Sequence, residues 1–151
     1  MAVAVDLWET IAQEAADESR LWGEALKADP EREPVFSPLG EARYALGLET
    51  IYEGYLLHYG RPRLFAPVDE DTALLLGDYL YAHGLVRIAA AGGVEAVAAM
   101  AELISRCAAL RAGGEDGDGE VWVAAARTLG GEPGDDAVAE ALVRHSARVG
   151  S

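Results

Sequence analysis

Residues 73–112 read ALLLGDYLYAHGLVRIAAAGG (73–93) followed by VEAVAAMAELISRCAALRA (94–112), and this stretch decides the fold. Alanine and leucine dominate it, and both are strong helix formers. The acidic segment Asp69–Asp71 precedes it and supplies an N-cap with a negatively charged first turn. Gly92-Gly93 predicts the end of one helix, and Gly113-Gly114 predicts the end of the next.

The rest of the chain has the same helical character. Prolines 30, 34 and 38 predict an irregular linker, and residues 59–68, with Gly60, Pro62 and Pro67, predict a loop. Together these features predict an all-α, single-domain bundle of about six helices over residues 1–151. The expected parts are an N-terminal helix (5–28), a central group of helices (38–112) and a C-terminal helical extension (113–151).

The composition narrows the class of partner. The chain has 26 acidic and 12 basic residues among 151, a formal net charge of −14. This excess argues against nucleic acids and anionic membrane surfaces, because both attract clustered Lys and Arg. The single cysteine excludes an internal disulfide framework and a thiolate zinc site. No stretch reaches the ~18 apolar residues of a transmembrane helix. Since Met1–Val5 is short and lacks a preceding basic residue, we expect a cytoplasmic protein without a transmembrane segment.

Three stretches in order resemble the trans-isoprenyl (polyprenyl) diphosphate synthases. Residues 48–58, LETIYEGYLLH, resemble the helix that leads into the first aspartate-rich motif of that family, with Glu49 and His58 at matching positions. Residues 60–62 resemble the loop that follows. Residues 73–82 then resemble the A-x-L-x-G-D-Y-L-x-A helix of the family. In this helix the motif positions of the family correspond to Gly77, Asp78 and Tyr79. The resemblance covers residues 47–111 and implies part of the isoprenoid synthase fold.

The same comparison shows where the chain departs from the family. Family members carry two aspartates directly after the position of His58, and here Tyr59 and Gly60 stand there. Those aspartates hold Mg²⁺ against the diphosphate leaving group, and Tyr and Gly side chains do not provide such ligands. The family's upstream cation-supplying segment is also absent, since residues 31–38 read EREPVFSP. We therefore expect no catalytic residue, no metal site and no cofactor in this chain.

The resemblance implies a function by association. The family includes heteromeric enzymes in which a small, non-catalytic helical subunit joins a catalytic one, so the expected partner is a larger prenyl synthase subunit or a second copy of this chain. Positions that set product length in the family correspond to Gly54 and Tyr55, which are the candidate pocket-lining residues. Two alternatives stay open: a free-standing helical domain that forms homo-oligomers or binds an apolar small ligand, and an enzyme with carboxylates recruited from elsewhere.

The remaining reactive side chains favour structural roles. His58, His83 and His145 fall on three different expected helices without metal-binding spacing, which is typical of helix-end or packing histidines. Cys107 lies on an apolar helix face and is expected to be buried. Residues 115–120, EDGDGE, lack the spacing of a calcium loop and predict a solvated turn.

A few further positions suggest how the helices pack. Gly77 lies inside an expected helix, where we interpret it as a point of close helix approach. The pair Arg61 and Arg63 is too small to predict a phosphate site. An aromatic stripe on the second expected helix predicts core or interface packing; it consists of Tyr44, Tyr52, Tyr55 and Tyr59.

Overall fold

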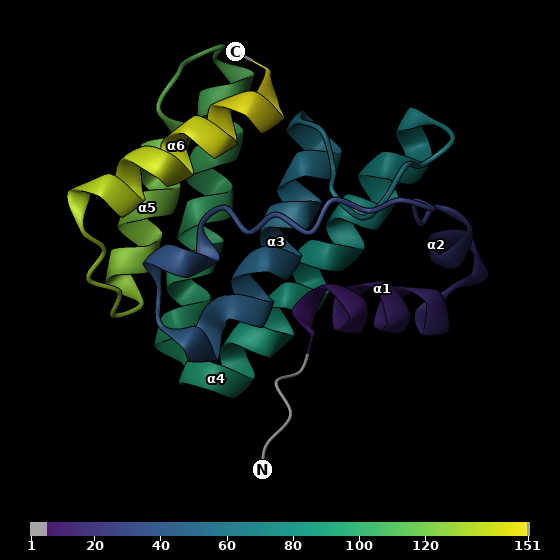
Figure 1. Cartoon of the computed structure of the whole chain (residues 1–151), viewed down its shortest axis with the longest axis horizontal. Coiled ribbons are helices and arrows are strands. Elements are labelled where there is room, and N and C mark those ends of the chain that lie inside the picture. The colour runs from purple at the N-terminus through teal and green to yellow at the C-terminus, as the bar shows by residue number, and fades with distance from the viewer. Residues whose placement is uncertain (1–5, 151) are drawn as a thin grey trace.

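The computed structural model describes residues 6–150, so Met1–Val5 and Ser151 lie outside it. Within this range the chain is all α-helical with no strand, which confirms the expected fold class (Figure 1). Two short 3-10 turns, η1 and η2, precede the third helix. The elements are α1 (Leu7–Glu18), α2 (Arg20–Glu24), η1 (Ser37–Leu39), η2 (Ala42–Tyr44), α3 (Ala45–Tyr59), α4 (Glu70–Ala112), α5 (Asp118–Thr128) and α6 (Asp135–Val149).

The N-terminal half differs from the expected helix boundaries. The expected first helix is interrupted at Ser19, whose backbone is extended and whose hydroxyl accepts a hydrogen bond from Leu21 N, so that α2 begins there. The central group of helices was expected to begin at residue 38, but its first helix, α3, begins at Ala45. Ser37, which could have capped a helix that began at residue 38, instead donates its hydroxyl to Glu49, and the chain makes two 3-10 turns before α3. A long-range contact thus replaces the local cap.

The two helices expected in residues 73–112 are both present, because α4 consists of two helical segments that meet at a sharp kink at Gly93. Gly93 has φ 75° and ψ −161°, a conformation that favours glycine. The bend frees the carbonyl of Ala91, which accepts a hydrogen bond from Arg43 Nη1 at 3.1 Å. The glycine pair therefore interrupts the helix where its end was predicted. The N-cap predicted within Asp69–Asp71 is Asp69, which accepts a 2.7 Å hydrogen bond from Thr72 N.

Helix α3 lies in the middle of the molecule, directly against α4 (Figure 1). The two backbones approach closely because glycines occupy the contact. A Cβ at Gly54 would lie 2.9 Å from the carbonyl oxygen of Gly77, and a Cβ at Gly84 would lie 2.4 Å from Ile51. The interpretation of Gly77 as a point of close approach agrees with this geometry.

A linker, residues 25–36, crosses α3 and joins the two ends of the molecule (Figure 1). It pairs with the loop after α3, since Lys27 N donates to Leu64 O at 2.9 Å and Ala66 N donates to Ala25 O at 2.7 Å. One apolar core lies between α3, the second half of α4, α5 and α6, and a second lies under α1. The linker passes over both cores and holds them together.

Candidate functional site

Glu49, the first motif position of the resemblance, belongs to a buried ion cluster around Arg63. Arg63 Nη1 lies 2.6 Å from Glu49 Oε1, and Arg63 Nε lies 3.0 Å from Glu53 Oε1; all three side chains are fully buried. The second oxygen of Glu49 accepts hydrogen bonds from Val35 N and Ser37 Oγ. These bonds fasten the linker and the loop after α3 onto α3, and we call Arg63, Glu49 and Glu53 the Arg63 cluster.

The Arg63 cluster is closed to ligands. Trp8 and Tyr52 place their rings 4.6 Å and 5.0 Å from the guanidinium carbon. Burial alone would lower the pKa of Arg63, but Glu49 and Glu53 outweigh it and raise that pKa, so the guanidinium is charged. A buried charge is tolerated when opposite charges and hydrogen-bond partners surround it, as they surround Arg63. The Arg63 cluster therefore fits a structural role, in which it holds the linker and the loop after α3 against α3.

The other motif positions also make contacts between helices. His58 Nε2 lies 3.2 Å from Asp78 Oδ1, at an angle that makes no hydrogen bond, and Gly77 packs beside the same imidazole. Asp78 is otherwise exposed, with 70% of its side chain accessible. Tyr79 stacks on His83 with ring centroids 5.5 Å apart. These residues lie at the α3–α4 contact or on the outer side of α4.

Gly54 and Tyr55, the candidate pocket-lining residues, occupy packed positions. The space beside Gly54 is filled by Gly77 and the ring of Tyr81. Tyr55 is 1% exposed and its hydroxyl donates to Asp118 on α5. Neither residue lines the pocket described next.

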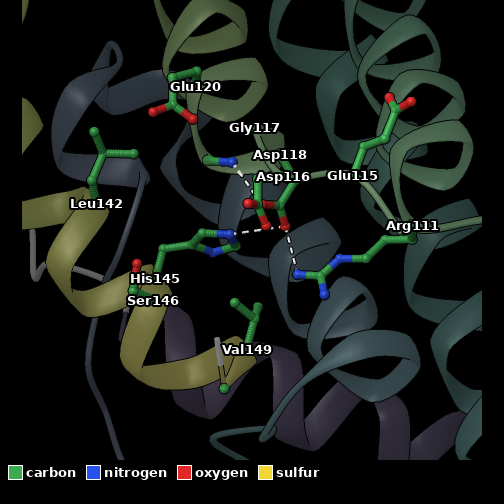
Figure 2. A pocket seen from close by; sticks show the side chains of 12 residues that line it. Arg111, Glu115, Asp116, Gly117, Asp118, Glu120, Leu142, His145, Ser146 and Val149 are labelled. Carbon is green, nitrogen blue, oxygen red and sulfur yellow. Dashed lines mark hydrogen bonds and ion pairs between the residues drawn. The ribbon is translucent and has the colours of Figure 1, made fainter. Parts of the chain in front are cut away.

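A pocket of about 330 Å³ lies between the end of α4, the loop that follows it, α5 and α6 (Figure 2). Arg111 and His145 reach toward Asp118 from opposite sides, and Leu142 and Val149 form an apolar wall on α6. Further carboxylates lie at its edge. They are Glu115, Asp116 and Glu120.

Asp118 is the centre of the polar side chains in this pocket. Its Oδ2 accepts hydrogen bonds from Arg111 Nη2 at 2.7 Å, from His145 Nε2 at 3.0 Å and from the Tyr55 hydroxyl. His145 Nδ1 lies 2.7 Å from the Tyr52 hydroxyl. With Nε2–H donating to the Asp118 carboxylate, His145 Nδ1 accepts the hydrogen bond from the Tyr52 hydroxyl. These five residues form the Asp118 cluster, which joins α3, α4, α5 and α6.

The electrostatics of the Asp118 cluster fix its protonation. Burial alone would raise the pKa of Asp118, but the bonds from His145, Tyr55 and Arg111 outweigh it and hold that pKa well below its usual value. Burial raises the pKa of both tyrosine hydroxyls well above 10, so they are protonated at neutral pH. Asp118 Oδ2 is therefore ionised and occupied by three donors. Such a carboxylate is a weak base. The Asp118 cluster instead links the helices that surround the pocket.

Sequence reasoning missed the role of Asp118. The turn at residues 115–120 was expected to be solvated, yet the Asp118 side chain is only 13% exposed. His145 is buried, at 3%, and Cys107 is buried at 1%, as expected for packing residues. Asp118 and His145 lie on separate helices, so no spacing pattern links them; the available signal was an aspartate in a first helical turn. Among residues 6–150, no group of His, Cys, Asp and Glu is arranged to hold a metal ion.

The second candidate site is an exposed apolar surface on the first half of α4. We call it the α4 outer face and define it by five exposed residues, Leu75, Ala82, Val86, Ala89 and Ala90. Leu75 is 58% exposed and Val86 is 64% exposed. Their spacing places all five on one side of the helix. The described chain leaves this side of α4 uncovered.

Helix α4 as a whole also has an apolar character. Its most apolar 18-residue window has a mean hydropathy of 1.5, yet only 22% of that window is buried. By length and composition alone, α4 is long and apolar enough to cross a membrane, although no such stretch was expected from the sequence. Core helices of soluble proteins pass the same test.

Comparisons with known proteins add nothing to these observations. No family model, no curated protein and no solved structure matches the chain. The resemblance to the prenyl synthase family therefore stays a prediction, and the candidate sites rest on the residues of this chain.

Proposed function

We propose that this chain is a non-catalytic helical subunit that binds another helical protein through the α4 outer face. The observation that carries the proposal is the exposure of Leu75 and Val86, together with three alanines, on a chain whose net charge is −14. Water-exposed apolar stripes of this kind mark association surfaces. Small side chains let a partner helix approach closely, and Leu75 and Val86 supply apolar area to bury.

The residues at the motif positions support a non-catalytic role. Glu49 is engaged by Arg63 and the linker, and His58 lies against Gly77 and Asp78. In the family the helix that matches α3 leads into the Mg²⁺-binding aspartates, whereas in this chain Glu49 and His58 make packing contacts. Following the resemblance, the proposed partner is a longer prenyl synthase chain that retains an intact D-D-x-x-D motif.

The packing and the pocket favour association over an apolar ligand. The α3–α4 contact has no room for a side chain at Gly54, let alone a lipid. The pocket beside Asp118 is edged by Glu115, Asp116 and Glu120, and an apolar ligand there would desolvate carboxylates without replacing their hydrogen bonds.

The first experiment compares capture by three tagged chains in the source organism: wild type, Val86→Glu and Val143→Glu. Val143 lies on α6 and is 70% exposed, so it matches Val86 in residue type and exposure. We expect wild type and Val143→Glu to retain a longer chain with an intact D-D-x-x-D motif, and Val86→Glu to lose it. A buried interface charge without a partner is strongly unfavourable, which gives the loss its physical cause.

Circular dichroism of Val86→Glu provides the folding control, because an exposed substitution should leave the helix content unchanged. Two results would contradict the proposal. One is equal capture of the longer chain by Val86→Glu. The other is recovery of this chain only with itself.

A further inference from the structure

We infer that the element docking on the α4 outer face is an amphipathic helix of a different protein, whose apolar stripe is bordered on both sides by Lys or Arg. This inference rests on the proposed function, because it assigns the chemistry of the partner for the same face. Its basis is the charge along the two borders of the face.

The first border faces α1. Tyr79, on this side of α4, packs against Trp22 with ring centroids 6.0 Å apart. Burial raises the pKa of Tyr79, and the negative charges of Glu18 and Glu14 raise it further, so both carboxylates lie within electrostatic reach of the phenol. The cation on this border, Arg87, has a side chain that is only 12% exposed and donates to Glu14. Glu14 is thus paired with Arg87 and also lies 3.7 Å from His83 Nε2, so the carboxylate of this border that a partner would meet is Glu18.

The second border lies on the opposite side of α4. Asp78 stands three residues after Leu75 and four before Ala82, and 70% of its side chain is exposed. Two turns toward the N-terminus, seven residues before Asp78, Asp71 is also exposed. The nearest titratable group from α3 is His58, whose side chain is only 13% exposed. Both borders of the apolar stripe are thus acidic.

This charge pattern favours a basic partner over a second copy. In a dimer packed through two α4 outer faces, acidic borders would meet acidic borders, and each chain carries a net charge of −14. Opposed like charges disfavour such a pairing, whereas Lys and Arg along both sides of a partner helix complement it. Anionic lipid headgroups meet the same repulsion as a second copy.

The test uses three synthetic amphipathic helices that share one leucine and alanine stripe and carry Lys, Gln or Glu along both borders. Binding to the full chain is measured by fluorescence anisotropy at low and high ionic strength. We expect the Lys-bordered helix to bind about 10-fold tighter than the Glu-bordered helix at low salt, with the Gln-bordered helix between them. The difference should shrink at high salt, because exposed charges are screened.

Two double variants that remove the same amount of charge test whether the acidic borders cause the preference for the Lys-bordered helix. Glu18→Gln/Asp78→Asn removes one acid from each border and leaves the Glu14–Arg87 pair intact. Asp29→Asn/Glu132→Gln removes the same total charge from exposed positions elsewhere. We expect the border variant to weaken binding of the Lys-bordered helix by about 3-fold to 10-fold, and the control to leave it near the wild-type value.

The outcomes separate this inference from the proposed function. If all three helices bind equally and Val86→Glu abolishes binding, the α4 outer face is an association surface without charge preference, and the inference alone fails. If no helix binds, the inference fails whatever the oligomeric state. A wild-type dimer that Val86→Glu dissociates would assign the face to a second copy and overturn both.

Discussion

At the scale of single residues, two charged side chains, the buried Arg63 and the largely buried Asp118, make contacts with distant segments of the chain. Arg63 draws in Glu49 and Glu53 on α3 and the carbonyl of Glu33 in the linker. Asp118 draws in side chains from α3, α4 and α6. Each would be costly to bury alone, and each is stable because its donors or acceptors arrive from other elements.

The lowered pKa of Asp118 predicts a pH-dependent contribution to stability. Because the folded-state pKa lies below the ordinary value of about 3.9, the ionised carboxylate stabilises the fold fully above that pH. This stabilisation is lost as pH falls through the lowered folded-state pKa. At pH 7, Asp118→Asn should lower the free energy of unfolding by about 1–3 kcal/mol, and its stability should depend less on pH below about 4. Urea denaturation across this pH range provides the measurement.

Asp116→Asn is the matched control for this prediction. Asp116 lies two residues before Asp118, in the loop that precedes α5, and it is exposed. It should keep nearly the wild-type stability at pH 7 and the wild-type pH dependence. An Asp118→Asn chain that lost stability in acid as steeply as wild type would show that the Asp118 cluster does not carry the linkage.

At the scale of elements, the sequence predicts what depends on local signals. The N-cap within Asp69–Asp71, the helix break at Gly92-Gly93 and the end of α4 near Gly113 agree with expectation. Helices α5 and α6 lie within the predicted C-terminal helical extension. The break at Ser19 and the late start of α3 were not predicted. Ser37 is held by Glu49 and Ala91 by Arg43, and such long-range bonds leave no mark in the local pattern. The Asp118 cluster was missed for the same reason.

Gly54→Ala tests whether the α3–α4 contact is packed or open. Alanine favours the helix by about 1 kcal/mol over glycine, so it would stabilise α3 if Gly54 lined a cavity. Its Cβ would instead lie 2.9 Å from the backbone oxygen of Gly77 and from the ring of Tyr81. We therefore expect a loss of about 1–3 kcal/mol in the free energy of unfolding, measured in urea.

Gly23→Ala gives the comparison for that prediction. A Cβ at Gly23 would meet Ala16 at 3.4 Å, an ordinary contact, so this substitution should be neutral or stabilising by up to about 1 kcal/mol. Opposite signs for the two glycines would support a closed α3–α4 contact. Stabilisation at both would favour an open pocket beside Gly54 and would revive the apolar-ligand alternative.

At the scale of the whole molecule, the linker couples parts that are far apart in the sequence. Lys27 Nζ donates to Pro62 O at 2.7 Å, and Arg144 Nη1 donates to Pro34 O at 3.1 Å. Arg148, nearly buried on α6, pairs with Glu31. The linker thereby connects α1 and α2 to the loop after α3 and to the C-terminal helix. A rigid arrangement of this kind presents the α4 outer face in one fixed position, as an association surface requires.

Arg63→Met tests that coupling, because it removes the central contact of the linker and leaves Glu49 and Glu53 buried without their cation. The free energy of unfolding should fall by about 3–5 kcal/mol, a large share of the 5–15 kcal/mol typical of a domain. Hydrogen exchange should show faster exchange at the amides of Val35 and Ser37, which Glu49 now holds. The triple variant Arg63→Met/Glu49→Gln/Glu53→Gln should recover part of the loss, because no uncompensated charge stays buried. If the single variant lost less than about 1 kcal/mol, the Arg63 cluster would not couple the linker to the core, and the fixed presentation of α4 would need another cause.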